Sequence, residues 1–143
     1  MAVIRECTKQ DFDQIVKLLG QLWPDASLNI EDLKKIYQKG LKSDSEYYLC
    51  ATIGSDIIGF CTLAVNNSLW QQGQLGCIEE LVVDEAHRGK GIGSELLTRI
   101  METAKLKGCR GIVLDSAFHR EASHRFYEKR GFVSEAYHFW KKL

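Results

Sequence analysis

Three glycines at alternate positions, Gly89, Gly91 and Gly93, stand directly before a segment with a helical pattern of apolar residues. Glycine inside a regular element lowers stability by about 0.5–1 kcal/mol relative to alanine. Three glycines together therefore indicate that the backbone must adopt a special conformation or approach a ligand closely here. The first amides of a helix lack intrahelical acceptors and lie at the positive end of the helix dipole, which suits phosphate. Arg88 and Lys90 add positive charge beside the glycines. This stretch predicts a phosphate-binding turn between a strand and a helix.

Two commoner phosphate-binding motifs do not match these glycines. A P-loop has Lys after its last glycine, whereas Ser94 follows Gly93 here. A dinucleotide-binding fingerprint has the spacing G-x-G-x-x-G in an early βαβ unit, whereas these glycines alternate and follow several expected strands. The structural alternative is a tight strand-to-helix turn that binds no ligand.

Two adjacent acids, Glu79 and Glu80, interrupt the apolar stretch that precedes the glycines. Side chains alternate along a strand, so one carboxylate is expected on each face. Carboxylates are rarely buried without a partner. One interpretation is a surface or ion-paired couple. The other is a base that takes a proton from a substrate amine, or a group that binds its ammonium form.

The elements that must hold these residues follow from the spacing of apolar residues. Strands are expected at residues 2–7, 47–53, 56–65, 76–83, 111–117 and 132–143, with a hairpin turn at Gly54-Ser55. Helices are expected at residues 8–23, 30–41, 93–107 and 120–130. This order predicts one domain over residues 1–143, of the α/β (α+β) class, with a mixed, mostly antiparallel sheet flanked by helices.

Composition narrows the classes of function. The 143 residues include 19 Lys and Arg against 19 Asp and Glu, which gives no basic field for nucleic acid. No run of eighteen apolar residues and no signal-peptide pattern occurs, so we expect a cytoplasmic protein without a membrane partner. Five cysteines without a CxxC pair favour reduced thiols, and four histidines without ligand spacing predict no metal.

Two motifs carry a family resemblance. The segment LVVDEAHRGKGIGSELL, residues 81–97, resembles the acetyl-CoA-binding motif of the GCN5-related N-acetyltransferases, the GNAT superfamily. The segment ASHRFYEKRGF, residues 122–132, is similar to the second signature of that family. The expected order of elements also fits the GNAT fold along essentially the whole chain. Within the superfamily, the chain is similar to small bacterial enzymes that acetylate primary amines, such as aminoalkylphosphonate and aminoglycoside 6′-N-acetyltransferases.

The resemblance implies direct transfer of acetyl from acetyl-CoA to a primary amine through a tetrahedral intermediate. It implies a splayed or bulged strand in which an amide near Leu81 or Val82 binds the thioester carbonyl and Val83 holds the pantetheine arm. Arg120 and Ser123 stand where the family often has Asn and Ala, so that contact with the cofactor departs from the pattern. The residues implied to contact acetyl-CoA are Leu81, Val82, Val83, Arg88, Gly89, Lys90, Gly91, Ile92, Gly93, Ser94, Arg120 and Ser123.

The resemblance also suggests catalytic groups. Related amine acetyltransferases carry Glu at the position of Glu79, which makes it the favoured base, with Glu80 second. Tyr127 matches the family tyrosine that gives a proton to the leaving thiolate; the alternative is an aromatic residue of the core. Three histidines are weaker candidates for the base: His119, His124 and His138.

The substrate is expected to be a small-molecule amine. Trp23, Asp25, Trp70 and His138 are candidates for the walls of a pocket suited to a cationic amine. Many relatives pair their C-terminal strands across a two-fold axis, so a homodimer is expected. The alternatives are an acyl-CoA-binding module without catalysis, a protein or peptide N-acetyltransferase, and a structural protein without a cofactor.

Overall fold

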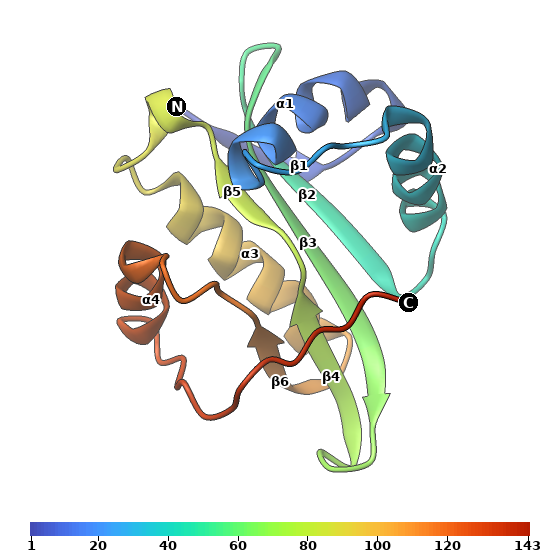
Figure 1. Ribbon diagram of the computed structural model, residues 1–143, viewed down its shortest axis with the longest axis vertical. Helices are drawn as coiled ribbons and strands as arrows, with labels where there is room; N and C mark the ends of the chain where they lie inside the picture. Colours follow the sequence, from blue (N-terminus) through green and yellow to red (C-terminus); the bar gives the residue numbers. More distant parts are fainter. The chain divides into compact units, whose positions relative to one another are not determined.

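The computed structural model describes residues 1–143, which divide into two compact units, residues 1–113 and 114–143 (Figure 1). The first unit contains the helices α1 (Phe12–Leu22), α2 (Ile30–Leu41) and α3 (Ile92–Leu106). Its strands are β1 (Val3–Glu6), β2 (Glu46–Ile53), β3 (Asp56–Ser68), β4 (Gly73–Ile78) and β5 (Leu81–Val83). Strand β6 (Cys109–Leu114) ends at the boundary, and α4 (Glu121–Glu128) lies in the second unit.

The sheet has the strand order β1-β2-β3-β4-β6, and β5 pairs with β3 beside this path. Strand β3 is the longest and is antiparallel to β2, β4 and β5 (Figure 1). The β2–β3 hairpin turns at Gly54, whose φ of 57° lies in the left-handed region. The mixed, mostly antiparallel sheet with its helices confirms the fold class that the sequence predicts.

The two faces of the sheet carry different helices. Phe60 of β3 belongs to a buried cluster with residues of α1 and α2, among them Ile15 and Tyr37. The neighbouring Gly59 points the other way, because side chains alternate along a strand. A Cβ at Gly59 would lie 2.8 Å from Leu96 of α3, so α3 packs closely on that face. Helices α1 and α2 therefore cover one face and α3 covers the other.

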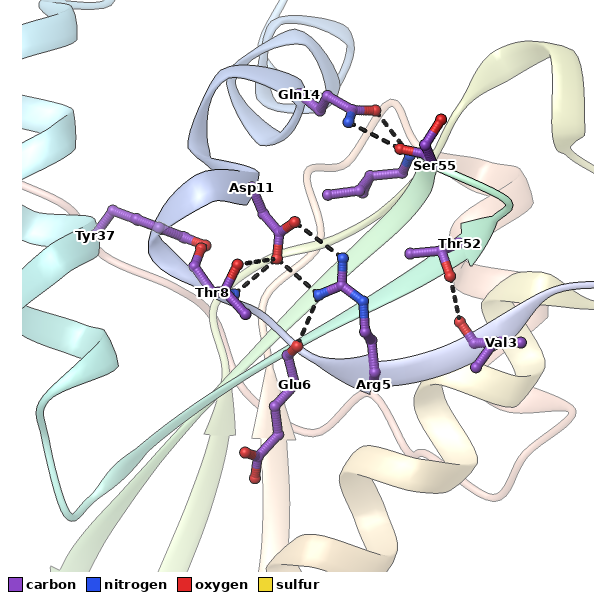
Figure 2. Close-up of polar contacts among 10 residues, drawn as sticks. Val3, Arg5, Glu6, Thr8, Asp11, Gln14, Tyr37, Thr52 and Ser55 are labelled. Carbon is purple, nitrogen blue, oxygen red and sulfur yellow. Dashed lines mark hydrogen bonds and ion pairs between the residues drawn. The ribbon is translucent and has the colours of Figure 1, made fainter.

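A partly buried ion pair fixes the start of the chain (Figure 2). Arg5 of β1 donates two hydrogen bonds to the carboxylate of Asp11, at 2.7 and 2.9 Å, and the amide of Thr8 donates to the same carboxylate. These bonds hold the pKa of Asp11 below its usual range, the bond from Arg5 being the largest cause. Tyr37 of α2 donates to the carbonyl of Thr8 at 2.7 Å. These contacts join β1 to the turn that precedes α1, and join that turn to α2.

Several expected element bounds differ from the structure. The expected strand 76–83 is two strands, β4 and β5, interrupted at Glu79 and Glu80. A turn of 3-10 helix over Lys9–Asp11 precedes α1, and the strand expected at 111–117 lies at Cys109–Leu114.

The strand expected at 132–143 is wrong, because this segment has no regular secondary structure. Its alternation of aromatic and polar residues is a side-chain pattern, and a strand also needs a hydrogen-bonded neighbour.

Candidate functional site

The glycine loop, residues 88–93, connects β5 to α3 through a short turn at Glu85–His87. Gly89 and Gly91 have φ values of 75° and 84°, a conformation that residues with a side chain rarely adopt. A Cβ at either glycine would meet no atom within 4 Å, so the surface above the loop is open. The loop therefore has the backbone shape and the clearance that a closely bound ligand requires.

The first turn of α3 points amides toward this open surface. The amide of Glu95 donates to the carbonyl of Gly91 at 3.0 Å, which is the first hydrogen bond of the helix. The amides of Ile92 and Gly93 precede it and have no backbone acceptor one turn earlier. Together with the dipole of a 15-residue helix, they form a site for an anion.

Three basic or hydroxyl side chains border this site. Arg88 donates from Nε to the carbonyl of Val83 at 2.9 Å, which folds the side chain back on the end of β5. Lys90 is exposed between the two left-handed glycines, and Ser94 lies in the first turn of α3. Arg88 and Lys90 therefore place positive charge beside an anion site.

The turn before the glycine loop is anchored to α1. Gln21 donates to the carboxylate of Asp84 at 2.8 Å and accepts from the amide of Glu85 at 2.9 Å. His87 pairs with the other oxygen of Asp84 at 2.8 Å. The bond from Gln21, followed by the one from His87, lowers the pKa of Asp84. These contacts fix where the glycine loop begins.

Strand β5 has one side paired and the other side without a strand. Thr62 donates its amide to the carbonyl of Glu80 at 3.0 Å, and the amide of Asp84 donates to Ile58 at 2.8 Å. Both bonds lie on the β3 side, so by alternation the polar backbone groups of Val82 also face β3. The amides of Leu81 and Val83 point to the opposite side, where no strand pairs with β5.

Glu79 and Glu80 lie in the interruption between β4 and β5, in different surroundings. Glu79 is exposed and accepts a weak bond from the thiol of Cys77 at 3.4 Å. Glu80 is partly buried, and burial raises its pKa to about 7. The negative charge of Glu79 adds to this increase, and a hydrogen bond from Thr62 opposes it. A carboxylate that titrates near neutral pH is suited to proton transfer.

The remaining candidates for catalysis and cofactor binding belong to the second unit. Tyr127 of α4 packs between Phe126 and Phe132, with ring centroids at 5.3 and 5.7 Å. Arg120 immediately precedes α4, and Ser123 lies in its first turn.

Two of the three histidine candidates of the second unit, His124 and His138, have identified neighbours, and His119 is exposed. The ring of His124 contacts the carbonyl of Ala117 at 2.9 Å, and His138 pairs with Asp115 at 3.0 Å. Both contacts are with groups of residues 114–143.

The predicted tryptophan and aspartate walls do not form one pocket. Trp23 is partly buried against the core between α1 and α2, while Asp25 is exposed. Trp70 is 89% exposed in the turn between β3 and β4. That turn and the α1–α2 connection lie at opposite ends of the long β3 strand (Figure 1). The structure therefore separates Trp70 from Trp23 and Asp25.

Four residues that hold the site were not among the sequence candidates: Gln21, Thr62, Asp84 and His87. Thr62 was visible as a polar residue inside the apolar run DIIGFCTLAV, which is a signal of a buried hydrogen bond. Gln21 gave no signal, because a polar residue at the end of an amphipathic helix is ordinary. No group of three His, Cys, Asp or Glu side chains is arranged to hold a metal ion. None of the helices combines the length and apolar composition needed to cross a bilayer.

Comparisons with known proteins agree with this geometry. The model of the acetyltransferase (GNAT) family matches residues 12–132. The aminoalkylphosphonate N-acetyltransferase of Salmonella typhimurium is 28% identical, over 98% of this chain and 90% of its own. The glucosamine 6-phosphate N-acetyltransferase of Trypanosoma brucei brucei is 31% identical, over 90% of this chain and 87% of its own.

A solved structure shares this fold. The crystal structure of a protein described as a transcriptional regulator from Bacillus halodurans C-125 superposes with a TM-score of 0.89, at 27% identity, over the whole of both chains. The family match covers most of the chain, including the glycine loop, the β4–β5 interruption and α4. The chain belongs to the GNAT family of acetyltransferases.

Proposed function

We propose that this protein transfers the acetyl group of acetyl-CoA to the primary amine of a small molecule. One observation carries the proposal: a partly buried carboxylate, two outward amides of a half-paired strand and an anion-binding helix start follow one another within residues 80–93. Acetyl-CoA carries its thioester, its pantetheine arm and its diphosphate in this order along an extended molecule, which matches the order of these three features.

The cofactor is held by backbone groups in this proposal. The amide of Leu81 donates to the acetyl carbonyl oxygen, where negative charge develops during transfer. The amide of Val83 donates to the pantetheine arm. The amides of Ile92 and Gly93 bind the diphosphate. Acetyl-CoA supplies an acetyl group activated as a thioester.

The glutamates handle the amine. An alkylammonium with a pKa of about 10 must lose a proton before its nitrogen can attack. We assign the base to Glu80, because its partly buried carboxylate has a pKa of about 7 and is held by Thr62. The sequence favoured Glu79 for this role. Its exposed carboxylate suits attraction of the ammonium ion instead.

Tyr127 is the proposed acid. Its hydroxyl gives a proton to the departing thiolate of CoA, as the tyrosine of the family signature is expected to do. The two phenylalanine rings that pack against Tyr127 fix the ring plane and thereby the direction of the hydroxyl.

The names of two relatives suggest a class of amine. An aminoalkylphosphonate and glucosamine 6-phosphate each carry a primary amine together with an oxyanion of phosphorus. We propose that the acceptor of this protein combines the same two groups. The amine reacts, and the phosphonate or phosphate distinguishes the substrate from other cellular amines.

The test measures release of free thiol from acetyl-CoA in the presence of matched amines. One pair is glucosamine 6-phosphate with glucosamine, and a second is 2-aminoethylphosphonate with ethanolamine. We expect turnover with a phosphorylated or phosphonylated member and slower turnover with its partner.

Three other outcomes would contradict the proposal. Equal rates within both pairs would refute the role of the phosphorus oxyanion. CoA binding by calorimetry without turnover of any amine would indicate a non-catalytic binding module, and turnover with peptides alone would indicate a peptide acetyltransferase.

We further propose that the protein works as a cytoplasmic homodimer. All five cysteines are free thiols, which fits a reducing compartment. The segment after α4 exposes three aromatic side chains that a second copy would cover, those of Tyr137, Phe139 and Trp140.

A further inference from the structure

The interruption between β4 and β5 contains one extra residue. Cys61 is the partner of Leu81, and Ala64 is the partner of Cys77. Between these pairs, β3 contributes two residues, 62 and 63, whereas the opposite segment contributes three, residues 78–80. One surplus residue on one side of an antiparallel pair is a β-bulge. Strands β4 and β5 therefore pair with β3 on either side of the bulge, β4 with residues 64–68 and β5 with residues 59–61.

Thr62 lies directly opposite this bulge. Its side chain is buried at 3% exposure, although it stands between apolar neighbours in β3. A buried hydroxyl without a partner is costly, so its hydrogen bonds decide its role.

Thr62 and Glu80 are joined by three hydrogen bonds across the bulge. The amide of Thr62 donates to the Glu80 carbonyl at 3.0 Å, and the amide of Glu80 donates to the hydroxyl oxygen of Thr62 at 3.0 Å. The hydroxyl in turn donates to the Glu80 carboxylate at 3.3 Å. One threonine thus holds both the backbone and the side chain of Glu80.

We propose that Thr62 is a positioning residue of the acetyl transfer, whose hydroxyl maintains the bulge and fixes the place of the Glu80 carboxylate. The proposal rests on the function above, in which Glu80 receives the proton of the amine. Thr62 touches neither substrate in this scheme. It acts through Glu80.

The surroundings of Glu80 explain why a donor is needed there. Glu79 and Glu46 bring negative charge close to it and raise its pKa, as burial does. Tyr48 of β2 is the cross-strand partner of Thr62, and its hydroxyl donates to Glu46 at 3.4 Å. The thiol of Cys61 is buried nearby, and its pKa is raised by burial and by Glu80. The bond from Thr62 opposes these influences, because it favours the ionised carboxylate.

The experiment compares Thr62→Val and Thr62→Ser with the wild type. Valine keeps the shape of the side chain and removes both hydroxyl contacts, and serine retains them. The pH profile of kcat/KM is measured with the best amine, together with the KM for acetyl-CoA. For Thr62→Val we expect the acidic limb to move up by roughly one pH unit and kcat to fall on the order of 100-fold. The KM for acetyl-CoA should stay close to the wild-type value, and Thr62→Ser should restore kcat.

The matched control is Thr52→Val. Thr52 is also a buried threonine of the sheet, at 7% exposure, and its hydroxyl donates only a long bond of 3.4 Å to Val3. This variant should lose some stability and keep the wild-type pH profile. A folded Thr62→Val protein with the wild-type profile and kcat would overturn the proposal, as would equal profile changes in both variants.

A second readout separates the two proposals. Carbon-13 NMR titration of the Glu80 carboxyl requires no turnover, so it tests the bond from Thr62 even if every amine fails. We expect a higher carboxyl pKa in Thr62→Val than in the wild type, and an unchanged pKa would overturn the proposal. If the valine variant does not fold, amide hydrogen exchange in the wild type gives the answer. The Glu80 amide should exchange more slowly than the Glu79 amide. Equal exchange rates would contradict the hydrogen bond from the Glu80 amide to the Thr62 hydroxyl.

Discussion

At the scale of residues, two neighbouring glutamates have been given different properties by a one-residue bulge. Glu79 is exposed, whereas Glu80 is partly buried beside Thr62. Burial and like charge make the ionised form of Glu80 unfavourable in the folded protein, and its pKa rises to about 7. The same property that makes Glu80 a useful base near neutral pH also lowers the stability of the fold.

Replacement of Glu80 by Gln should therefore separate stability from activity. The pKa of Glu80 is about 7 in the folded protein and about 4.3 in the unfolded chain. Between these two pH values the folded state therefore binds more protons than the unfolded state. Wild-type stability is then lost as the pH rises through this window. Glu80→Gln should be roughly 3–4 kcal/mol more stable than the wild type at pH 8 and nearly equal to it at pH 4. Its kcat should fall on the order of 100-fold.

Urea unfolding at pH 4 and pH 8, together with steady-state rates, checks this prediction. Glu79→Gln is the control, because it removes the neighbouring exposed carboxylate. An active Glu80→Gln enzyme would remove Glu80 from the role of base. A Glu79→Gln enzyme with the larger loss of kcat would return that role to Glu79.

The proposed acid gives a second prediction at this scale. Tyr127→Phe keeps the ring that packs against Phe126 and Phe132 and removes only the hydroxyl. We expect kcat to fall on the order of 100-fold, since protonation of the leaving thiolate is lost, while the Kd of CoA stays unchanged. Stopped-assay rates and calorimetry measure the two quantities. Tyr137→Phe, in the exposed segment that follows α4, should behave as the wild type. An undiminished kcat in Tyr127→Phe would exclude the acid role.

At the scale of elements, the glycine loop before α3 makes the start of this helix suitable for binding an anion. Two left-handed glycines turn the chain out of β5, and the helix then begins with amides that have no backbone acceptor. Gln21 ties the turn to α1 through Asp84 and Glu85, so the loop is held from a second element. Anchoring the start of the loop in advance reduces the ordering that a ligand must impose.

The loop can be tested with a pair of glycine substitutions. Gly91→Glu places a negative side chain in the open space where we expect the diphosphate, and the Kd of CoA should weaken on the order of 100-fold. Gly54→Glu is the control, because that glycine also has positive φ and open space, in the β2–β3 turn. Each substitution should cost about 1–2 kcal/mol of stability from backbone strain. Calorimetry that finds tight CoA binding in Gly91→Glu would refute the site.

The sequence predicted most elements and the binding loop, and the reasons for its failures are physical. The helical spacing of apolar residues located α1, α2 and α3. A helix that buries one face carries apolar residues at this spacing whatever its partner is. The family resemblance implied a splayed or bulged strand near residues 80–83, but the residue pattern of 76–83 alone does not indicate the β4–β5 interruption, because a bulge depends on the partner strand. The strand predicted at 132–143 is wrong for the same reason: alternation of side chains does not determine whether a segment pairs with a neighbouring strand. Trp23 and Trp70 were grouped by chemistry, and the length of β3 separates their loops.

At the scale of the whole molecule, the segment after α4 matters for assembly. Tyr137, Phe139 and Trp140 expose at least three-quarters of their surface, which is unusual for aromatic side chains of a lone chain. Burial of such residues against a second copy would remove apolar surface from water. Balanced charge, with 19 basic and 19 acidic residues, imposes no strong repulsion between two copies.

Sedimentation should accordingly give a mass of about twice the 16.3 kDa of the chain. Trp140→Glu places a charge among the exposed aromatics and should shift the protein toward monomer. The control is Trp70→Glu, since Trp70 is 89% exposed and lies in the first unit. A wild-type monomer at assay concentrations would contradict the dimer, and equal dissociation of both variants would contradict the assigned surface.

The unpaired side of β5 has a consequence for how long the protein survives. A ligand that accepts hydrogen bonds from Leu81 and Val83 finds them in place only in the folded state. By mass action, such a ligand at 100 times its Kd adds about 2.7 kcal/mol to the free energy of unfolding. A cell that exhausts its acetyl-CoA would then hold an enzyme that unfolds more often and is degraded sooner. Nutrient supply would set the abundance of this protein as well as its rate.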